Sequence, residues 1–125
     1  MKLAQSMYAE VLVLSPHGRL DHDNCAEFHL ALDNYLEQKG DKSMRGVVLD
    51  LSGLEYVSSA GLRCFMLAAK QARAHGGRIL IAAMQPVVGE IFEISRFNLI
   101  LDAFPTVAAA LESLSPASAQ AYHRA

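Results

Sequence analysis

The 125-residue sequence lacks an excess of basic residues, a long apolar run and an apolar leader segment. Its formal charge is −2 and its pI is about 6.2, so it offers no cationic surface for nucleic acid or an anionic membrane. The apolar runs stop well short of the ~20 residues that span a bilayer, and residues 1–6 contain no signal-peptide core. We therefore expect a cytoplasmic protein without direct nucleic-acid binding or membrane insertion.

Signatures of catalysis and of metal binding are also missing. The sequence has no Gly-x-x-x-x-Gly-Lys-Ser/Thr phosphate-binding loop and no serine in a Gly-x-Ser-x-Gly hydrolase elbow. Its histidines show no paired ligand spacing; they are His17, His22, His29, His75 and His123. Cys25 and Cys64 are isolated, which favours two small apolar side chains over a disulfide or a nucleophile and suggests a reducing compartment. We expect a protein that is not an enzyme and has no cofactor and no metal.

A change of periodicity within residues 49–62 marks the centre of the chain. Residues 47–51 form a short apolar run, typical of a strand covered on both faces. An amphipathic stripe at i, i+3, i+4 and i+7 then follows at Leu62, Phe65, Met66 and Ala69. Ser58 or Ser59 can cap that helix by accepting a hydrogen bond from a first-turn N–H. Asp50 ends the strand, where we expect its carboxylate to bond loop amides.

The flanking segments alternate between strand-like and helix-like patterns. Strands are predicted around Leu3, from Tyr8 to Leu14 with a closing turn at 15–18, at 78–83 and at 99–101. Helices are predicted from residue 25 to a stop at Gly40, from Pro86 to about residue 96, and from Pro105 to Leu114. This alternation indicates an α/β fold with a mainly parallel sheet.

The composition predicts one domain. Hydrophobic residues make up 52% of the chain, enough for a core of its own. We expect this domain to span residues 1–115. Residues 116–125 are small, polar and aperiodic, so we expect a flexible C-terminal tail.

Five short motifs follow one another along the chain. They are Gly18-Arg19-Leu20-Asp21, Val48-Leu49-Asp50-Leu51-Ser52, Ser58-Ser59-Ala60-Gly61-Leu62, Gly76-Gly77 and Ile94-Ser95-Arg96-Phe97. In this order and spacing they resemble the STAS domain of anti-sigma factor antagonists, from about Tyr8 to Leu114. The resemblance implies a STAS-like fold, a mixed and mostly parallel sheet of about four to five strands with about four helices packed against it.

The same resemblance implies a function in transcription regulation by partner switching. The unphosphorylated protein would bind an anti-sigma factor that is also a serine kinase, and so free the sigma factor. Phosphorylation of one serine would end that binding, and a serine phosphatase is a further candidate partner. In the family this serine lies two residues before the Gly-Leu pair, which is Ser59 here. In the best-known members the preceding residue is often aspartate, where this chain has Ser58.

Each candidate residue also has a purely structural interpretation. Ser59 could be an N-cap worth about 1 kcal/mol and Ser58 a loop hydroxyl that satisfies the turn. Asp21, which the resemblance places on the binding surface, could instead cap the first helix. Arg63 falls off the apolar stripe, so we expect it to be exposed, either merely solvated or contacting the partner. Gly61 would allow a close approach of backbone, to the chain itself or to the partner. The expected partner-binding set is Asp21, Ser58, Ser59, Gly61 and Arg63.

A second interpretation keeps the fold but not the phosphorylation. The protein would then be an accessory or scaffold subunit of a membrane transporter or of a signalling complex. The two interpretations differ at Ser59, because only the switch requires its modification. A phosphate at a helix N-terminus meets free N–H groups and the positive end of the helix dipole. We therefore expect phosphorylation to change binding rather than folding.

Overall fold

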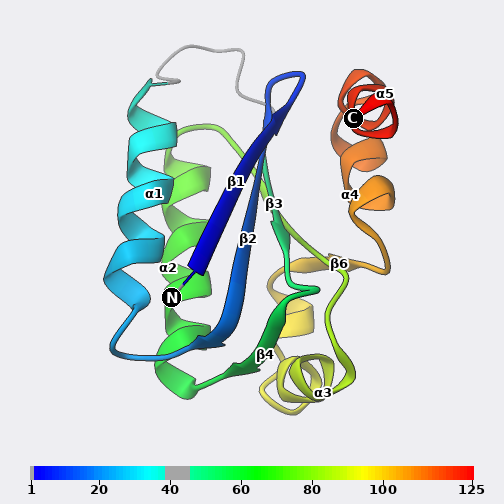
Figure 1. Cartoon of the computed structure of the whole chain (residues 1–125). Helices are drawn as coiled ribbons and strands as arrows, with labels where there is room; N and C mark the ends of the chain where they lie inside the picture. Colours follow the sequence, from blue (N-terminus) through cyan, green and yellow to red (C-terminus); the bar gives the residue numbers. More distant parts are fainter. Residues whose placement is uncertain (1, 39–45) are drawn as a thin grey trace.

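The computed structural model describes the backbone of residues 2–38 and 46–125 (Figure 1). The expected helix stop at Gly40 lies outside the described residues. In chain order the elements are β1 (Lys2–Tyr8), β2 (Val11–Leu20), α1 (Cys25–Gln38), β3 (Val47–Asp50), β4 (Leu54–Val57), α2 (Ser59–Ala74), β5 (Ile79–Ala82), α3 (Pro86–Ile94), the 3-10 helix η1 (Phe97–Leu99), β6 (Asp102–Phe104), α4 (Val107–Leu114) and α5 (Pro116–Arg124).

The described strands form one sheet of six strands. Its order is β1-β2-β3-β5-β6, and β4 pairs with the end of β2. Among these described pairs, only β1–β2 is antiparallel. The parallel pairs are β2–β3, β3–β5, β5–β6 and β2–β4. The α/β class and the mixed, mostly parallel sheet are confirmed. The described chain has six strands and five α-helices, slightly more than the sequence predicted.

The core has two layers, one on each face of the sheet. Along β2, Leu12 and Leu14 point into the layer under α1, α2 and α3, while Val11 and Val13 point into the layer under α4 and α5. Figure 1 shows α1 and α2 on one side of the sheet and α4 on the other. Within the described residues no helix is both long and apolar enough to cross a membrane.

Strand β2 runs through the segment that the sequence predicts as a turn. The predicted turn at 15–18 is wrong, because Pro16 pairs with Leu3 of β1 and Gly18 pairs with Leu54 of β4. The register shifts between Gly18 and Arg19, and Gly18 has a φ of +86°, so these residues bend the strand instead of reversing it. The strand predicted around Leu3 is confirmed.

Two short strands differ from their predicted places. The segment between β3 and α2, which we expected to be a loop, contains β4. This strand has only four residues, too few for a sequence pattern to reveal it. The strand predicted at 99–101 is wrong: Arg96 adopts a left-handed conformation with φ +63° as the N-cap of η1, and Leu99 and Ile100 stay exposed. The strand forms three residues later, where Asp102 pairs with Leu80 of β5.

Residues 116–124 form helix α5, so the expected flexible tail is wrong. Ser115 caps this helix by accepting a hydrogen bond from the N–H of Ser118, and Pro116 takes the first position. Ser118 is fully buried, and Tyr122 packs edge-on against Tyr8 of β1 with ring centroids 5.2 Å apart. Small residues hide the periodicity of α5 in the sequence, yet they allow it to pack closely.

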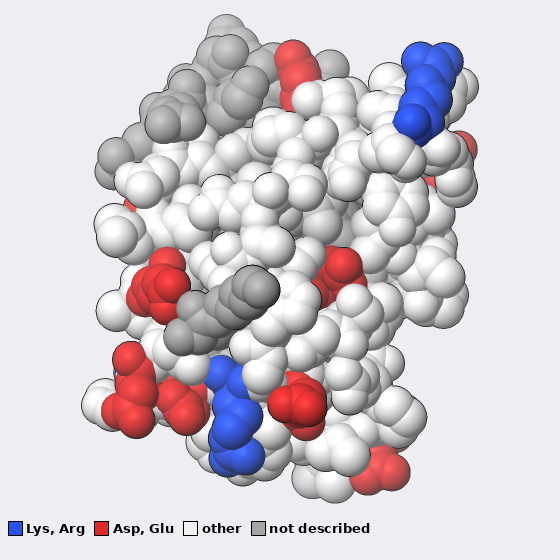
Figure 2. Space-filling model, viewed as in Figure 1, with Lys and Arg blue, Asp and Glu red and all other residues white. Residues whose placement is uncertain are grey.

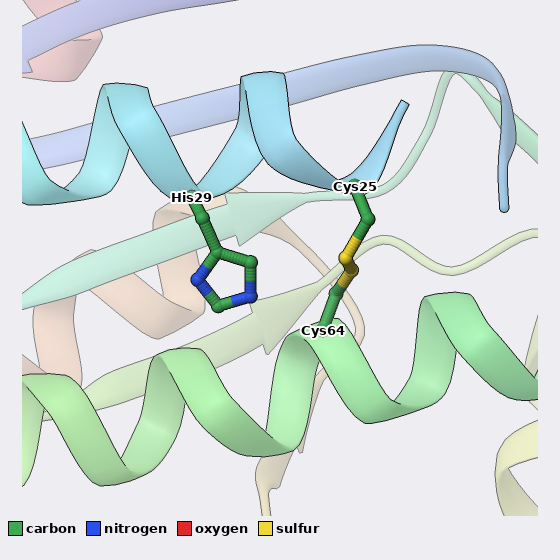
Figure 3. Close-up of side chains that lie close together, drawn as sticks. All are labelled: Cys25, His29 and Cys64. Atoms are coloured by element: carbon green, nitrogen blue, oxygen red, sulfur yellow. A yellow bond between two sulfur atoms is a disulfide. The ribbon is translucent and has the colours of Figure 1, made fainter. Parts of the chain in front are cut away.

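Cys25 and Cys64 form a disulfide between the start of α1 and the second turn of α2 (Figure 3). The prediction of two independent apolar thiols is therefore wrong. The residues are 39 positions apart, but packing of the two helices brings their Cα atoms to 6.1 Å, within the usual range for a disulfide. That proximity arises from tertiary packing and has no signature in the local sequence.

Candidate functional site

The predicted site residues gather where β2 and β4 end and where α1 and α2 begin (Figure 1). After the register shift at Gly18, the two strands pair again through Arg19 with Tyr56 and end at the pair Leu20 and Val57. The N–H of Ser58 then donates to the carbonyl oxygen of Leu20 at 3.0 Å. This bond fixes the loop after β2, which begins with Asp21, beside the start of α2.

Ser58 is the N-cap of α2. Its backbone is extended, with φ −83° and ψ 174°, and its Oγ accepts a hydrogen bond from the N–H of Gly61 at 3.1 Å. Its carbonyl oxygen accepts from the N–H of Leu62 at 2.9 Å, so the helix follows directly. Of the two serines that could cap this helix, the geometry selects Ser58.

Ser59 is the first residue of α2 and is exposed. Because Ser58 supplies the cap, the helix does not depend on the Ser59 hydroxyl. The first turn of α2 contains no acidic residue. Arg63, four positions further along the same helix, is exposed as predicted, and residues at i and i+4 lie on one side of a helix. An anion on Ser59 would therefore meet first-turn N–H groups, the positive end of the dipole and a guanidinium.

Gly61 makes the close approach within its own chain. A Cβ built there would lie 2.5 Å from the Leu20 carbonyl oxygen and 2.7 Å from Val57 Cγ2. The residue is buried. Gly61 therefore allows α2 to pack directly on the ends of β2 and β4, and this packing sets the position of the two serines.

Asp21 belongs to a tight turn before α1 rather than to the cap of that helix. Its Oδ1 accepts from the N–H of Asp23 at 3.0 Å, and its own N–H donates to Oδ1 of Asn24 at 2.9 Å. The Asn24 amide in turn donates to the carbonyl oxygen of Arg19 at 2.7 Å. These bonds hold the loop in one conformation beside Ser58, with Asp21 half-buried.

One pair of residues at this site was not found from the sequence. The Arg19 guanidinium lies 4.4 Å from the centroid of the Tyr56 ring, and both residues are exposed. They face each other across β2 and β4, so the pair is invisible until β4 is recognised. The available signal was the aromatic Tyr56 two residues before Ser58.

The charge at this end of the molecule is mixed. Figure 2 shows acidic side chains spread around one basic side chain over the lower end of the view, where α1, β4 and α3 lie in Figure 1. Asp23 and Glu27 are exposed at the start of α1.

Two further groups offer ligand atoms. Asp50 has the structural role that we predicted, because its Oδ1 accepts from the N–H of Ser52 at 3.1 Å. Cys25, His29 and Cys64 place one ligand atom each within 4.8 Å of one another. Among the described residues they form the only such group that could hold a metal ion.

Comparison with known proteins identifies the class. Residues 6–110 match the family model of the STAS domain. The chain therefore belongs to the STAS domain family, as the motifs predicted. A relative from Bordetella bronchiseptica, BtrV, carries the name of an anti-sigma factor antagonist and is 39% identical over 105 residues, which are 84% of each chain. Within the STAS family the chain groups with the anti-sigma factor antagonists.

Solved structures support the fold. SpoIIAA, an anti-sigma factor antagonist, in its unphosphorylated form covers 90% of this chain and 96% of its own, with a TM-score of 0.73 and 16% identity. The phosphorylated form of the Bacillus cell fate determinant SpoIIAA covers 91% and 100%, with a TM-score of 0.68 and 16% identity. At such identities the likeness shows the fold alone.

Proposed function

We propose that this protein is an anti-sigma factor antagonist that works by partner switching. In its unphosphorylated form it binds an anti-sigma factor with serine kinase activity and frees the sigma factor, and phosphorylation of Ser59 ends the binding. The observation that carries the proposal is the division of roles between two neighbouring serines. Ser58 holds the helix, while Ser59 is exposed and structurally dispensable.

Phosphorylation of Ser59 is compatible with the fold. A phosphate adds roughly −1.5 to −2 charges. At the first position of α2 it meets the dipole and N–H groups that lack intrahelical partners, and Arg63 lies one turn away. The relative SpoIIAA keeps the fold in both its unphosphorylated and its phosphorylated forms, which supports the same tolerance here.

The same phosphate would oppose docking. The proposed binding surface consists of the Asp21 loop, Ser58, Ser59 and Arg63. The bond from Ser58 to Leu20 links the end of β2 to the start of α2, and further bonds fix the Asp21 turn and the cap of α2. A partner that covers Ser59 would have to desolvate a dianion or face it with acidic groups. Either cost can exceed the few kcal/mol that separate bound from free protein.

The decisive experiment is intact-mass analysis after incubation with ATP and each candidate anti-sigma kinase of the cell. We expect one added phosphate on the wild type and none on Ser59→Ala. Ser58→Asn is the matched control, because asparagine caps a helix about as well as serine but carries no hydroxyl. This variant should still gain one phosphate. Phosphate on Ser59→Ala but not on Ser58→Asn would assign the site to Ser58 and refute the proposal.

A pull-down tests the second half of the switch. Wild type should retain the anti-sigma factor, and Ser59→Asp should lose it while its far-UV circular dichroism and melting temperature stay close to those of the wild type. A serine phosphatase that removes the phosphate should restore binding. If no kinase modifies the protein and Ser59→Asp binds as the wild type does, the accessory or scaffold interpretation replaces the switch.

A further inference from the structure

The layer between α1 and α2 contains a cluster of three side chains that the proposed function does not use. Cys25 opens α1, His29 follows four residues later on the same side of that helix, and Cys64 faces them from α2. Figure 3 shows the His29 ring and both cysteines pointing into the space between the two helices. The three ligand atoms lie within 4.8 Å of one another.

His29 indicates that the cluster does more than form a disulfide. Its Nε2 is buried and has no hydrogen-bond partner, the only such side-chain nitrogen or oxygen in the part of the chain that the structure describes. A buried polar atom without a partner carries a desolvation cost. The disulfide sulfurs nearby are weak acceptors and offset little of that cost. A cation between the helices would give this nitrogen a partner.

We propose that the reduced protein binds one zinc ion through Cys25, His29 and Cys64. Two thiolates and one imidazole are a ligand set that Zn²⁺ takes, and water can fill the fourth position. Binding converts two thiols to Zn–S bonds and releases two protons. A small-molecule disulfide that takes up two electrons closes the same sulfurs into the protein disulfide and releases the ion, so zinc and the disulfide exclude each other. A thiol or phosphine reductant, which supplies two electrons, opens the site.

Burial and spacing suit this ion. Cys64 is fully buried in the apolar layer, where a lone thiolate would be uncompensated. Two thiolates and Zn²⁺ sum to zero charge. With Zn–S bonds of about 2.3 Å, the sulfurs of a tetrahedral site stand about 3.8 Å apart. A Cα–Cα distance of 6.1 Å allows this separation by side-chain rotation. Cys25 and His29 are only half-buried, which leaves an entry path for the ion.

The test is a Co²⁺ titration of the full chain, reduced with a phosphine and kept free of oxygen, followed by Zn²⁺ displacement. We expect one equivalent of Co²⁺, a sulfur-to-cobalt charge-transfer band in the near ultraviolet, and displacement by Zn²⁺ with a Kd of about 1 µM or tighter. His29→Gln should weaken Zn²⁺ binding by about tenfold or more. His75→Gln is the control, because His75 is exposed beyond the far end of α2.

Two further samples keep the result interpretable. Protein oxidised with a small-molecule disulfide should give no charge-transfer band. Cys64→Ala, checked by circular dichroism, should lose most of the band, and the half-exposed Cys25→Ser gives a second measure if Cys64→Ala fails to fold. The proposal is overturned if the reduced wild type shows no band, or if His29→Gln and His75→Gln bind Zn²⁺ equally well. None of these readouts requires an anti-sigma factor or a phosphate on Ser59.

Discussion

The N-cap of α2 offers a direct test of the different roles of Ser58 and Ser59. In Ser58→Ala the N–H of Gly61 loses the Oγ that accepts its hydrogen bond at 3.1 Å. Because Ser58 is half-buried, water replaces that acceptor only in part. Removing an N-cap side chain costs about 1 kcal/mol, within a range of roughly 0.5–2 kcal/mol. Ser59→Ala removes an exposed hydroxyl and should change the unfolding free energy by less than about 0.5 kcal/mol.

The assay is urea unfolding monitored by far-UV circular dichroism. With a urea m-value of about 2 kcal/mol/M, Ser58→Ala should lower the unfolding midpoint by about 0.5 M. Its melting temperature should fall by about 3–5 °C. Ser58→Asn should unfold close to the wild-type midpoint, because the amide oxygen restores the cap. Equal losses of stability in Ser58→Ala and Ser59→Ala would show that the two hydroxyls do not have the separate roles that the structure indicates.

Four further outcomes follow from the packing and from the charges at the start of α2. Gly61→Ala should lower the unfolding free energy by about 1–3 kcal/mol through overpacking. Gly89→Ala in α3 should raise it by up to about 1 kcal/mol, because a Cβ there meets nothing within 4 Å. Urea unfolding measures both changes. Removal of residues 116–125 should lower the melting temperature by more than about 5 °C, whereas a loose tail would leave it unchanged. A double-mutant cycle of Ser59→Glu with Arg63→Ala should give a favourable coupling of about 0.3–0.5 kcal/mol that disappears in about 1 M salt; a coupling that persists in salt would contradict an exposed ion pair.

Elements with a clear local pattern were predictable from the sequence. The stripe of α2, the apolar run of β5 and the start of α3 at Pro86 all lie where the pattern predicts them. Each is specified by local features, either a repeat of period 3.6 or a short apolar run between turn residues. These elements were sufficient to establish the α/β class.

The errors concern features that only tertiary pairing specifies. Pro16 and Gly18 resemble a turn locally, but β1 and β4 pair on either side of the bend and keep β2 continuous. Helix α5 lacks an apolar stripe and depends on contacts such as that of Tyr122 with Tyr8. The pairing of Cys25 with Cys64 likewise depends on how α1 packs on α2. No local window of sequence contains this information.

At the candidate site, too, local sequence patterns predicted some features, and tertiary contacts determined the others. The motif at residues 58–62 located both serines, but the choice of Ser58 as cap required the bond to Gly61. The sequence left open which chain Gly61 approaches, and the distance to Leu20 answers that question. The Arg19–Tyr56 pair depends on an unpredicted strand, so it entered only with the structure.

The neutral cap has a consequence for the chemistry of Ser59. An aspartate at the position of Ser58 would also accept the hydrogen bond from Gly61, but it would place a negative charge beside a phosphate on Ser59. Two unit charges about 4 Å apart repel by about 1 kcal/mol in water and by several times more at a partly desolvated surface. With serine at this position, the helix keeps its cap, and a phosphate on Ser59 would meet the dipole and the free N–H groups without a carboxylate at the cap position. Capping the helix requires only an oxygen that accepts a hydrogen bond, whereas repelling the phosphate requires a charged side chain. The residue at the cap position can therefore tune the stability of the phosphorylated form without altering the fold.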